Sequence, residues 1–212
     1  MNIQAIEHLK NVDSRLAKVI DHVGNNLNME YNSSIDSFFF LVKEIVGQML
    51  SSTVKKIIVS RLVVLCENVL TPEKVSELNI AQLRNIGLSK SKANYIINLA
   101  NLVKSREITF EKFYNLTDDE IIAELTKIRG IGNWTAKMYL IFYLQRENVL
   151  PYEDAAFLQA YKWLYNTKLT SPKSISRRCK RWQPYTSIGA KYLYIALDSG
   201  LTKVPIGDFL NG

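Results

Sequence analysis

The chain contains few cysteine, histidine, glycine and proline residues: two Cys, two His, nine Gly and five Pro in 212 positions. Cys66 and Cys179 lie far apart and have no second pair of cysteines nearby, so their spacing supports neither a zinc site nor an iron–sulfur cluster. We expect both thiols to be reduced and buried. Because 47% of the residues are hydrophobic and glycine and proline are scarce, the composition indicates an ordered globular protein.

Long apolar runs are also absent. No stretch approaches the roughly eighteen uninterrupted apolar residues of a membrane span, and the first residues lack a signal-peptide pattern. The sequence therefore predicts a soluble, intracellular protein with no membrane partner. Acidic residues number 20 against 27 basic ones, and the resulting net charge of +7 favours a polyanionic partner, although many basic proteins bind none.

Apolar residues recur at three- and four-residue spacing along most of the chain, which is the period of amphipathic helices. Examples are the stretches 6–23 and 38–65, the second interrupted at Ser51, which offers a new N-cap. There is neither a long segment with the alternation of a strand nor a solenoid repeat. The fold class predicted is all-α, with roughly ten helices.

The most informative segment is 125–137, in which Gly130 and Gly132 flank one apolar residue between two amphipathic stretches. This pattern predicts a helix-hairpin-helix over about residues 121–144, with the second helix running from about Asn133 to Tyr143. The glycines alone could simply end one helix and begin another. In a tight hairpin, however, the exposed amides at the second helix N-terminus can bind a phosphate, and side chains of the first turn can join them. The residues predicted to contact the DNA backbone are Gly130, Ile131, Gly132, Asn133, Thr135 and Lys137.

An acid follows the hairpin at Asp154, twenty residues after Trp134. A phosphate-binding turn with a lone acid beyond the end of its second helix suggests chemistry on DNA. Taken alone, an Asp that follows a proline is most often a surface or helix-cap carboxylate. Glu153 is the adjacent competitor for the catalytic role.

Three blocks make the chain resemble the helix-hairpin-helix base-excision DNA glycosylases, and within them the 3-methyladenine DNA glycosylase II group. Residues 47–51 are similar to the family's Gly-Gln-x-x-Ser segment, and residues 83–93 to its Leu-Arg-x-x-Gly-Leu-Ser-x-x-Lys-Ala segment. Residues 128–136 resemble its hairpin, and Asp154 stands in the Pro-x-x-Asp position of the catalytic acid. Weaker similarity at residues 181–185 extends the resemblance toward the C-terminus.

The resemblance implies two helical lobes with an active-site cleft between them that holds a flipped base. One lobe would combine residues 1–35 with 147–212 and carry Asp154 at its edge. The other would comprise residues 36–146 and the hairpin. Bifunctional relatives carry a lysine directly after Gly-x-Gly-x, where this chain has Trp134, so the resemblance implies a monofunctional glycosylase without AP-lyase activity.

Roles for other residues are likewise implied by the family. Asp154 would stabilise the oxocarbenium-like sugar and position or deprotonate water, and Trp134 would stack on an electron-poor base. Relatives place aromatics where this chain has Met138, Ala155 and Ala156, so the pocket differs in shape. The predicted base pocket comprises Trp134, Met138, Tyr152 and Tyr194. The DNA-inserting segment comprises Gln48, Met49, Leu50 and Ser51, with Met49 or Leu50 as the wedge.

No cofactor is expected beyond a structural sodium or potassium ion, which hairpin carbonyls of relatives can hold. Here those carbonyls would belong to Thr126, Ile128 or Arg129, and Ile131. The basic run 177–181 is interpreted as a solvated face, with contact to phosphate as the alternative. The expected partner is damaged double-stranded DNA, bound by a monomer located in the cytoplasm or nucleoid of a bacterium or archaeon, or in a eukaryotic nucleus.

The sequence therefore predicts a DNA repair glycosylase that flips an alkylated purine of the 3-methyladenine type and hydrolyses its N-glycosidic bond. One alternative is a glycosylase for a neutral lesion such as uracil, hypoxanthine or an oxidised purine. A second alternative is a helix-hairpin-helix protein that binds DNA without catalysis.

Overall fold

The computed structural model describes residues 3–24 and 36–211, and within these ranges it contains helices and no strand, which confirms the all-α prediction. The described residues divide into two compact units, each of which is treated by itself. Unit 1 combines residues 3–24 with 140–211, and unit 2 comprises residues 36–139. The sequence analysis began the second part of the discontinuous lobe at residue 147. In the structure this part begins at residue 140, so residues 140–146 belong to unit 1 rather than to unit 2. None of the described helices is both long and apolar enough to cross a membrane.

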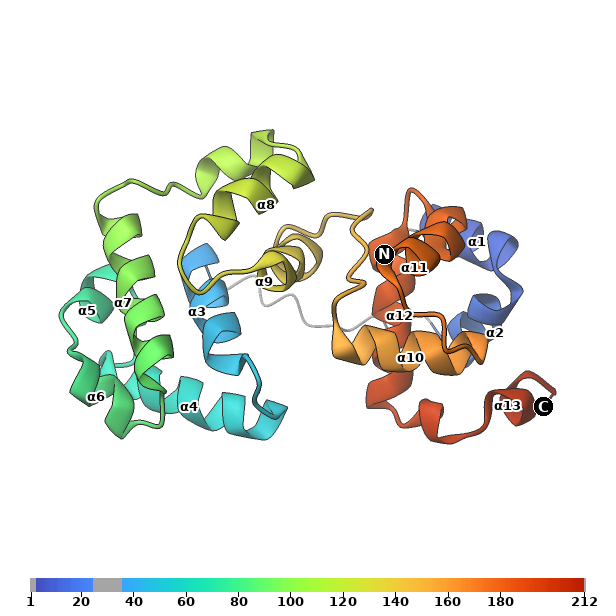
Figure 1. The fold of residues 1–212 in the computed structure, drawn as a ribbon, viewed down its shortest axis with the longest axis horizontal. Helices are drawn as coiled ribbons and strands as arrows, with labels where there is room; N and C mark the ends of the chain where they lie inside the picture. The colour runs from blue at the N-terminus through green and yellow to red at the C-terminus, as the bar shows by residue number, and fades with distance from the viewer. Residues whose placement is uncertain (1–2, 25–35, 212) are drawn as a thin grey trace. The chain divides into compact units, whose positions relative to one another are not determined.

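Unit 2 is built around α7 (Lys90–Lys104), which packs against three other helices, α3, α5 and α6 (Figure 1). Ser51 caps α4, as the sequence predicted, and Thr117 caps α8 through a reciprocal capping box with Glu120. Near the end of the unit, Tyr139 bonds Ser37 at 2.8 Å between the two hydroxyl oxygens and packs edge-on against Phe40. The helices of unit 2 besides α7 are α3 (Ser37–Gly47), α4 (Ser52–Leu65), α5 (Pro72–Ser76), α6 (Ile80–Asn85), α8 (Asp118–Thr126) and α9 (Asn133–Met138), with a 3-10 turn at Glu111–Asn115.

The predicted helix from Asn133 to Tyr143 consists of two parts in the structure. Helix α9 ends at Met138 and continues as a π-helical segment, Tyr139–Tyr143. A π turn shifts the register of the backbone hydrogen bonds by one residue, so the side chains after Met138 leave the face that a continuous α-helix would give them.

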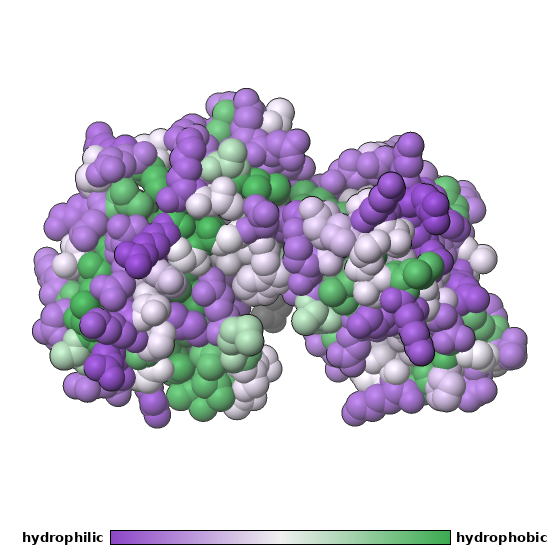
Figure 2. Space-filling view, in the orientation of Figure 1, coloured by the Kyte–Doolittle hydropathy of each residue, from purple (hydrophilic) through white to green (hydrophobic). Residues whose placement is uncertain are grey.

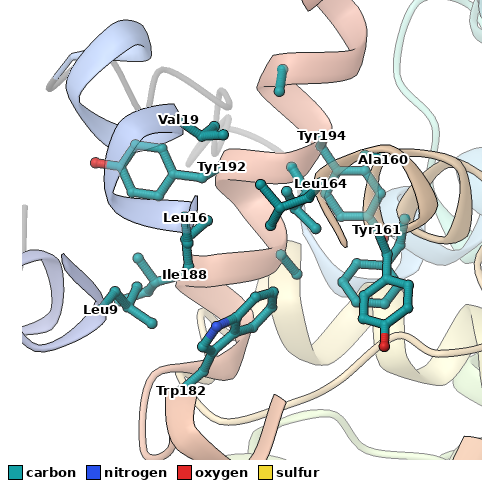
Figure 3. Packing of buried hydrophobic residues seen from close by; sticks show 14 of the residues in the cluster. Leu9, Leu16, Val19, Ala160, Tyr161, Leu164, Trp182, Ile188, Tyr192 and Tyr194 are labelled. Atoms are coloured by element: carbon teal, nitrogen blue, oxygen red, sulfur yellow. The ribbon is translucent and has the colours of Figure 1, made fainter. Parts of the chain in front are cut away.

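Unit 1 joins the beginning of the chain to its end. Helix α12 packs against α10, α2 and α1, so residues separated by about 180 positions share one core (Figure 3). Trp182 is fully buried there, and a Cβ at Gly189 would lie 2.7 Å from its ring, so the tryptophan requires a glycine at that position. The helices of unit 1 are α1 (Ile3–Val12), α2 (Ser14–Val23), α10 (Ala155–Tyr165), α11 (Pro172–Cys179), α12 (Thr186–Asp198) and α13 (Ile206–Asn211), with 3-10 turns at Lys180–Trp182 and Leu201–Lys203.

A buried carboxylate also holds unit 1 together. Asp13 is 3% exposed, and one of its oxygens caps α2 by accepting the Leu16 amide at 3.1 Å. The other oxygen accepts the Trp182 indole N–H at 3.0 Å and the hydroxyl of Tyr165. Because these donors satisfy the buried charge, Asp13 ties α2 to α10 and to the turn at Trp182.

Candidate active site

The hairpin between α8 and α9 depends on one of its two glycines for its shape. Gly130 has φ +95°, and a Cβ there would lie 2.4 Å from the ring of Tyr95, so both the backbone and its neighbour require glycine. Gly132 has φ −103°, which any residue can adopt, and a Cβ there would meet nothing within 4 Å. The surface over Gly132 is therefore open.

Helix α9 begins at this open surface. Gly132 is its N-cap and supplies no side chain to bond the amides of the first turn. Gly132 and Asn133 are exposed. Thr135 and Lys137, whose side chains the sequence analysis expected to join in holding a phosphate, are only 1% and 8% exposed. Little of either residue is accessible in this structure, and a role for their side chains in holding a phosphate stays a prediction.

Gln48 connects the loop after α3 to the hairpin. Its side-chain amide donates to the carbonyl of Gly130 at 2.9 Å and lies 3.4 Å from the hydroxyl of Thr135. Lys92 donates to the carbonyl of Val46 at 2.9 Å and to that of Gln48 at 2.5 Å, where helix α3 ends. These bonds fix the loop relative to the hairpin, an arrangement that the sequence analysis did not predict. The two donors, Gln48 and Lys92, lie in the family-like segments 47–51 and 83–93, and these segments were the only sign of the link in the sequence.

The loop held in this way presents Met49 to solvent. Met49 has φ +58° and a fully exposed side chain, at 101% of its reference area. Leu50 is 38% exposed, and Ser51 accepts the Val54 amide as the N-cap of α4. Figure 2 shows further apolar side chains gathered over α4. Of the two wedge candidates, Met49 is the one that projects from the surface.

The predicted acid, Asp154, lies in unit 1 as the N-cap of α10. Its carboxylate accepts the Phe157 amide at 2.7 Å, and the residue is 8% exposed, whereas Glu153 is exposed. The chain leading to it is fixed to α12, because the Ser187 hydroxyl accepts the Val149 amide at 2.9 Å and donates to the Val149 carbonyl at 3.2 Å. Asp154 is thus a buried carboxylate on a well-anchored segment.

Tyr194 of α12 approaches this acid. Burial raises the pKa of its hydroxyl above the ordinary value, and the neighbouring charge of Asp154 raises the pKa further. The hydroxyl is buried, and no partner meets the geometry of a full hydrogen bond with it. Tyr194 therefore remains protonated in the neighbourhood of the carboxylate. Phe142 packs on its ring at 5.7 Å between centroids.

The remaining pocket candidates occupy different places. Trp134 is half-buried in the first turn of α9, and Met138 is 5% exposed at its end, both in unit 2. Tyr152, half-buried in unit 1, packs against the same core as Tyr194. Of these candidates, Tyr194 lies close to Asp154, and both belong to unit 1.

Within residues 3–24 and 36–211, no three His, Cys, Asp or Glu side chains form a group that could hold a metal ion. Of the carbonyls proposed for a monovalent cation, that of Ile128 accepts the Ile131 amide at 3.0 Å and so helps to close the turn. The cation at the hairpin stays a prediction.

An all-helical chain with a glycine hairpin and a buried acid after it is of the helix-hairpin-helix class, and comparison with known proteins specifies the family. The model of the HhH-GPD superfamily base excision DNA repair proteins matches residues 42–184. The chain belongs to this superfamily, which confirms both the resemblance drawn from the three sequence blocks and the predicted role in base excision repair.

Individual relatives agree with this assignment. DNA-3-methyladenine glycosylase 1 of Schizosaccharomyces pombe is 28% identical over 194 residues, which is 88% of this chain and 84% of that protein. The solved structure of the Schizosaccharomyces pombe 3-methyladenine DNA glycosylase Mag1 in complex with abasic DNA matches with a TM-score of 0.81 at 27% identity, covering 92% of this chain and 97% of that one. A Bacillus halodurans DNA-3-methyladenine glycosidase matches with a TM-score of 0.83 at 29% identity, covering 100% and 97%.

Proposed function

We propose that the protein is a monofunctional DNA glycosylase that removes alkylated purines of the 3-methyladenine type from duplex DNA. The observation that carries the proposal is the buried carboxylate of Asp154, anchored as the cap of α10 and following the hairpin at the family's spacing. Similar proteins named 3-methyladenine DNA glycosylases, one of them solved with abasic DNA, support the substrate class and the partner.

In the proposed reaction the bond between C1′ of the sugar and the purine nitrogen breaks, and the electron pair leaves with the base. The ionised carboxylate of Asp154 stabilises the positive charge that develops at C1′. A water molecule then adds to C1′ and gives up its proton to the Asp154 carboxylate, so that an abasic sugar and a free base result. A purine that alkylation has made cationic leaves as a neutral base and needs no separate general acid.

Trp134 accounts for the proposed lack of strand cleavage. An AP-lyase of this family needs an amine that attacks the sugar and forms an imine, and an indole nitrogen cannot do this. The aromatic ring instead offers a surface on which a cationic base can stack, an attraction of about 0.5 to 2 kcal/mol depending on how fully the base is desolvated.

Met49 is the proposed wedge that fills the space left by the flipped nucleotide. Met49 is fully exposed on a loop that Gln48 and Lys92 fix, whereas Leu50 is less exposed, so Met49 is the better candidate for the wedge. The exposed turn at Gly132 and Asn133 is proposed to bind the phosphate backbone. We further propose that the protein acts as a monomer, which sedimentation would check.

The test is release of free base from methylated duplex DNA, followed by borohydride treatment of the reaction with the same DNA. We expect release of 3-methyladenine and no covalent protein–DNA adduct. A trapped adduct would contradict the monofunctional assignment.

Uracil, hypoxanthine and oxidised-purine duplexes belong in the same series, because Met138, Ala155 and Ala156 depart from the family's aromatic pattern. Release from one of these alone would move the proposal to a neutral lesion. Binding of every duplex without release of any base would indicate a DNA-binding protein without catalysis.

A further inference from the structure

Unit 1 contains a pocket of about 250 Å³ beside α11, away from the sequence segments assigned to the reaction. Arginine side chains make up half of its lining, and Figure 2 shows strongly hydrophilic residues gathered over this helix. The lining residues are Tyr161, Leu169, Ser174, Arg177, Arg178 and Arg181.

Arg178 is held at this pocket by two aromatic rings of α10. Its guanidinium carbon lies 4.7 Å from the ring centroid of Tyr165 and 5.8 Å from that of Tyr161. Such stacking orients the planar guanidinium and leaves its edge, with the N–H donors, to face other groups. Figure 3 shows Tyr161 among the buried residues of α10.

One donor nitrogen of Arg178 is unsatisfied. Its Nη1 is buried and has no hydrogen-bond partner. A buried donor on a charged group that lacks an acceptor is costly, because it has lost water without replacement. The folded chain therefore leaves one donor of this arginine unpaired.

The charge around the pocket is also unbalanced. Among the ion pairs of the described residues, none involves Arg177, Arg178 or Arg181. The buried acid of this region is Asp13, which lies behind Tyr165 and whose two oxygens already accept three hydrogen bonds. Three arginine side chains therefore line a pocket whose lining includes no acidic residue.

The positions of these groups are partly fixed by local bonds. The Nε of Arg181 donates to the carbonyl of Arg178 at 3.2 Å, so the side chain of Arg181 folds back along the helix end. Ser174, one turn before Arg178, adds a hydroxyl to the lining and bonds the Ser171 hydroxyl at 2.8 Å. Several N–H donors and one hydroxyl thus line a single concave space.

We propose that this pocket binds a phosphate group through Arg177, Arg178 and Arg181. Phosphate suits the site better than a carboxylate does, since its tetrahedral oxygens can accept from several guanidinium groups at once. Leu169, which is exposed, adds an apolar side chain to the lining that could contact the remainder of a phosphate ester. The phosphate is either part of a DNA strand, in which case the inference rests on the proposed function, or belongs to a free phosphate ester.

The test compares a double variant, Arg177→Gln with Arg181→Gln, with the control Lys173→Gln with Lys180→Gln. Both variants remove two positive charges from the same exposed segment, but the two lysines do not line the pocket. Neither variant touches Asp154 or the hairpin. Melting in chloride buffer checks that all three proteins are folded.

Two measurements distinguish the sources of the phosphate. Affinity for a duplex containing a stable abasic site is measured by fluorescence anisotropy at several salt concentrations. Each lost phosphate contact lowers the slope of log K against log salt by about 0.9. Thermal stabilisation by inorganic phosphate, at constant ionic strength, is measured on each protein without DNA.

A slope lowered by about 1 to 2 in the arginine variant, and less in the lysine control, assigns the pocket to a DNA phosphate. Unchanged DNA binding with loss of the phosphate-dependent increase in Tm assigns it to a free phosphate ester. The proposal is overturned if the arginine variant behaves like the lysine control in both measurements. Base release by the wild type is assayed separately, so a failure of the glycosylase proposal would be seen independently of this result.

Discussion

Two substitutions of Asp154 separate its structural role from its chemical one. The carboxylate caps α10 by accepting the Phe157 amide at 2.7 Å and is 8% exposed, so it has a structural task whatever its role in catalysis. Asparagine is about as good an N-cap as aspartate, whereas alanine removes the acceptor. We therefore expect Asp154→Asn to retain the cap and lose only the charge.

The magnitudes follow from the capping bond. Asp154→Ala should lower the free energy of unfolding by about 1 kcal/mol, within a range of about 0.5 to 2, which corresponds to a fall in Tm of about 2 to 4 °C per kcal/mol for a chain of this size. Asp154→Asn should change it by less than about 0.5 kcal/mol. Base release should fall on the order of a hundredfold or more in both variants, because the charge that stabilises the sugar cation is absent.

The assay pairs thermal or urea unfolding with single-turnover release of 3-methyladenine and with affinity for abasic duplex. DNA binding by Asp154→Asn should be retained or strengthened, since a negative charge near phosphate has been removed. Glu153→Gln, at the exposed neighbour, is the control and should retain activity. Wild-type turnover by Asp154→Asn would refute the catalytic assignment. An equal loss of stability in the Asn and Ala variants would refute the capping argument.

Four further predictions concern other parts of the molecule. Gly132→Ala should fold normally and bind DNA more weakly, because the added Cβ meets no protein atom within 4 Å and occupies the exposed turn. Gly130→Ala should instead lower the Tm, because its Cβ would lie 2.4 Å from the ring of Tyr95. Thermal melting measures the Tm and fluorescence anisotropy the DNA affinity of each variant. Full DNA affinity in both variants would contradict this prediction. Gln48→Ala should remove the bond to the hairpin carbonyl and speed amide exchange at the hairpin, as hydrogen–deuterium exchange would report, and unchanged exchange would argue against the link. Met49→Ala should reduce base release while leaving Tm within about 1 °C, because the side chain is fully exposed, and a large loss of Tm would show that it packs in the fold. Cys179, whose pKa burial raises to about 12, should remain protonated and unreactive toward a thiol reagent at pH 8 until the protein is unfolded, and rapid labelling of the native protein would contradict this prediction.

Local signals in the sequence predicted much of the fold. Helix periodicity and capping residues such as Ser51 and Thr117 act within one or two turns of the chain, so their consequences can be read without a tertiary structure. The glycine hairpin and the position of Asp154 were accessible for the same reason. The π-helical segment after Met138 could not be predicted, because an apolar stretch of sequence looks the same whether it forms an α-helix or a π-helix.

The tertiary structure decided which of the predicted residues are accessible. The sequence treated Met49 and Leu50 as equivalent and placed Thr135 on the DNA-facing side, whereas packing exposes Met49 fully and buries Thr135 beside Gln48. No local pattern fixes such burial, because it depends on which helices meet.

The chain by itself therefore determined that the protein is all-helical, that it carries a glycine hairpin and an acid in the family's register, and that it belongs with base excision repair proteins. Only the folded structure determined that Lys92 fixes the loop preceding α4, and that Arg178 stacks on tyrosines of α10 beside an arginine-lined pocket. The physical reason is that helices and caps form from neighbouring residues, whereas a site forms from side chains that packing brings together from distant positions.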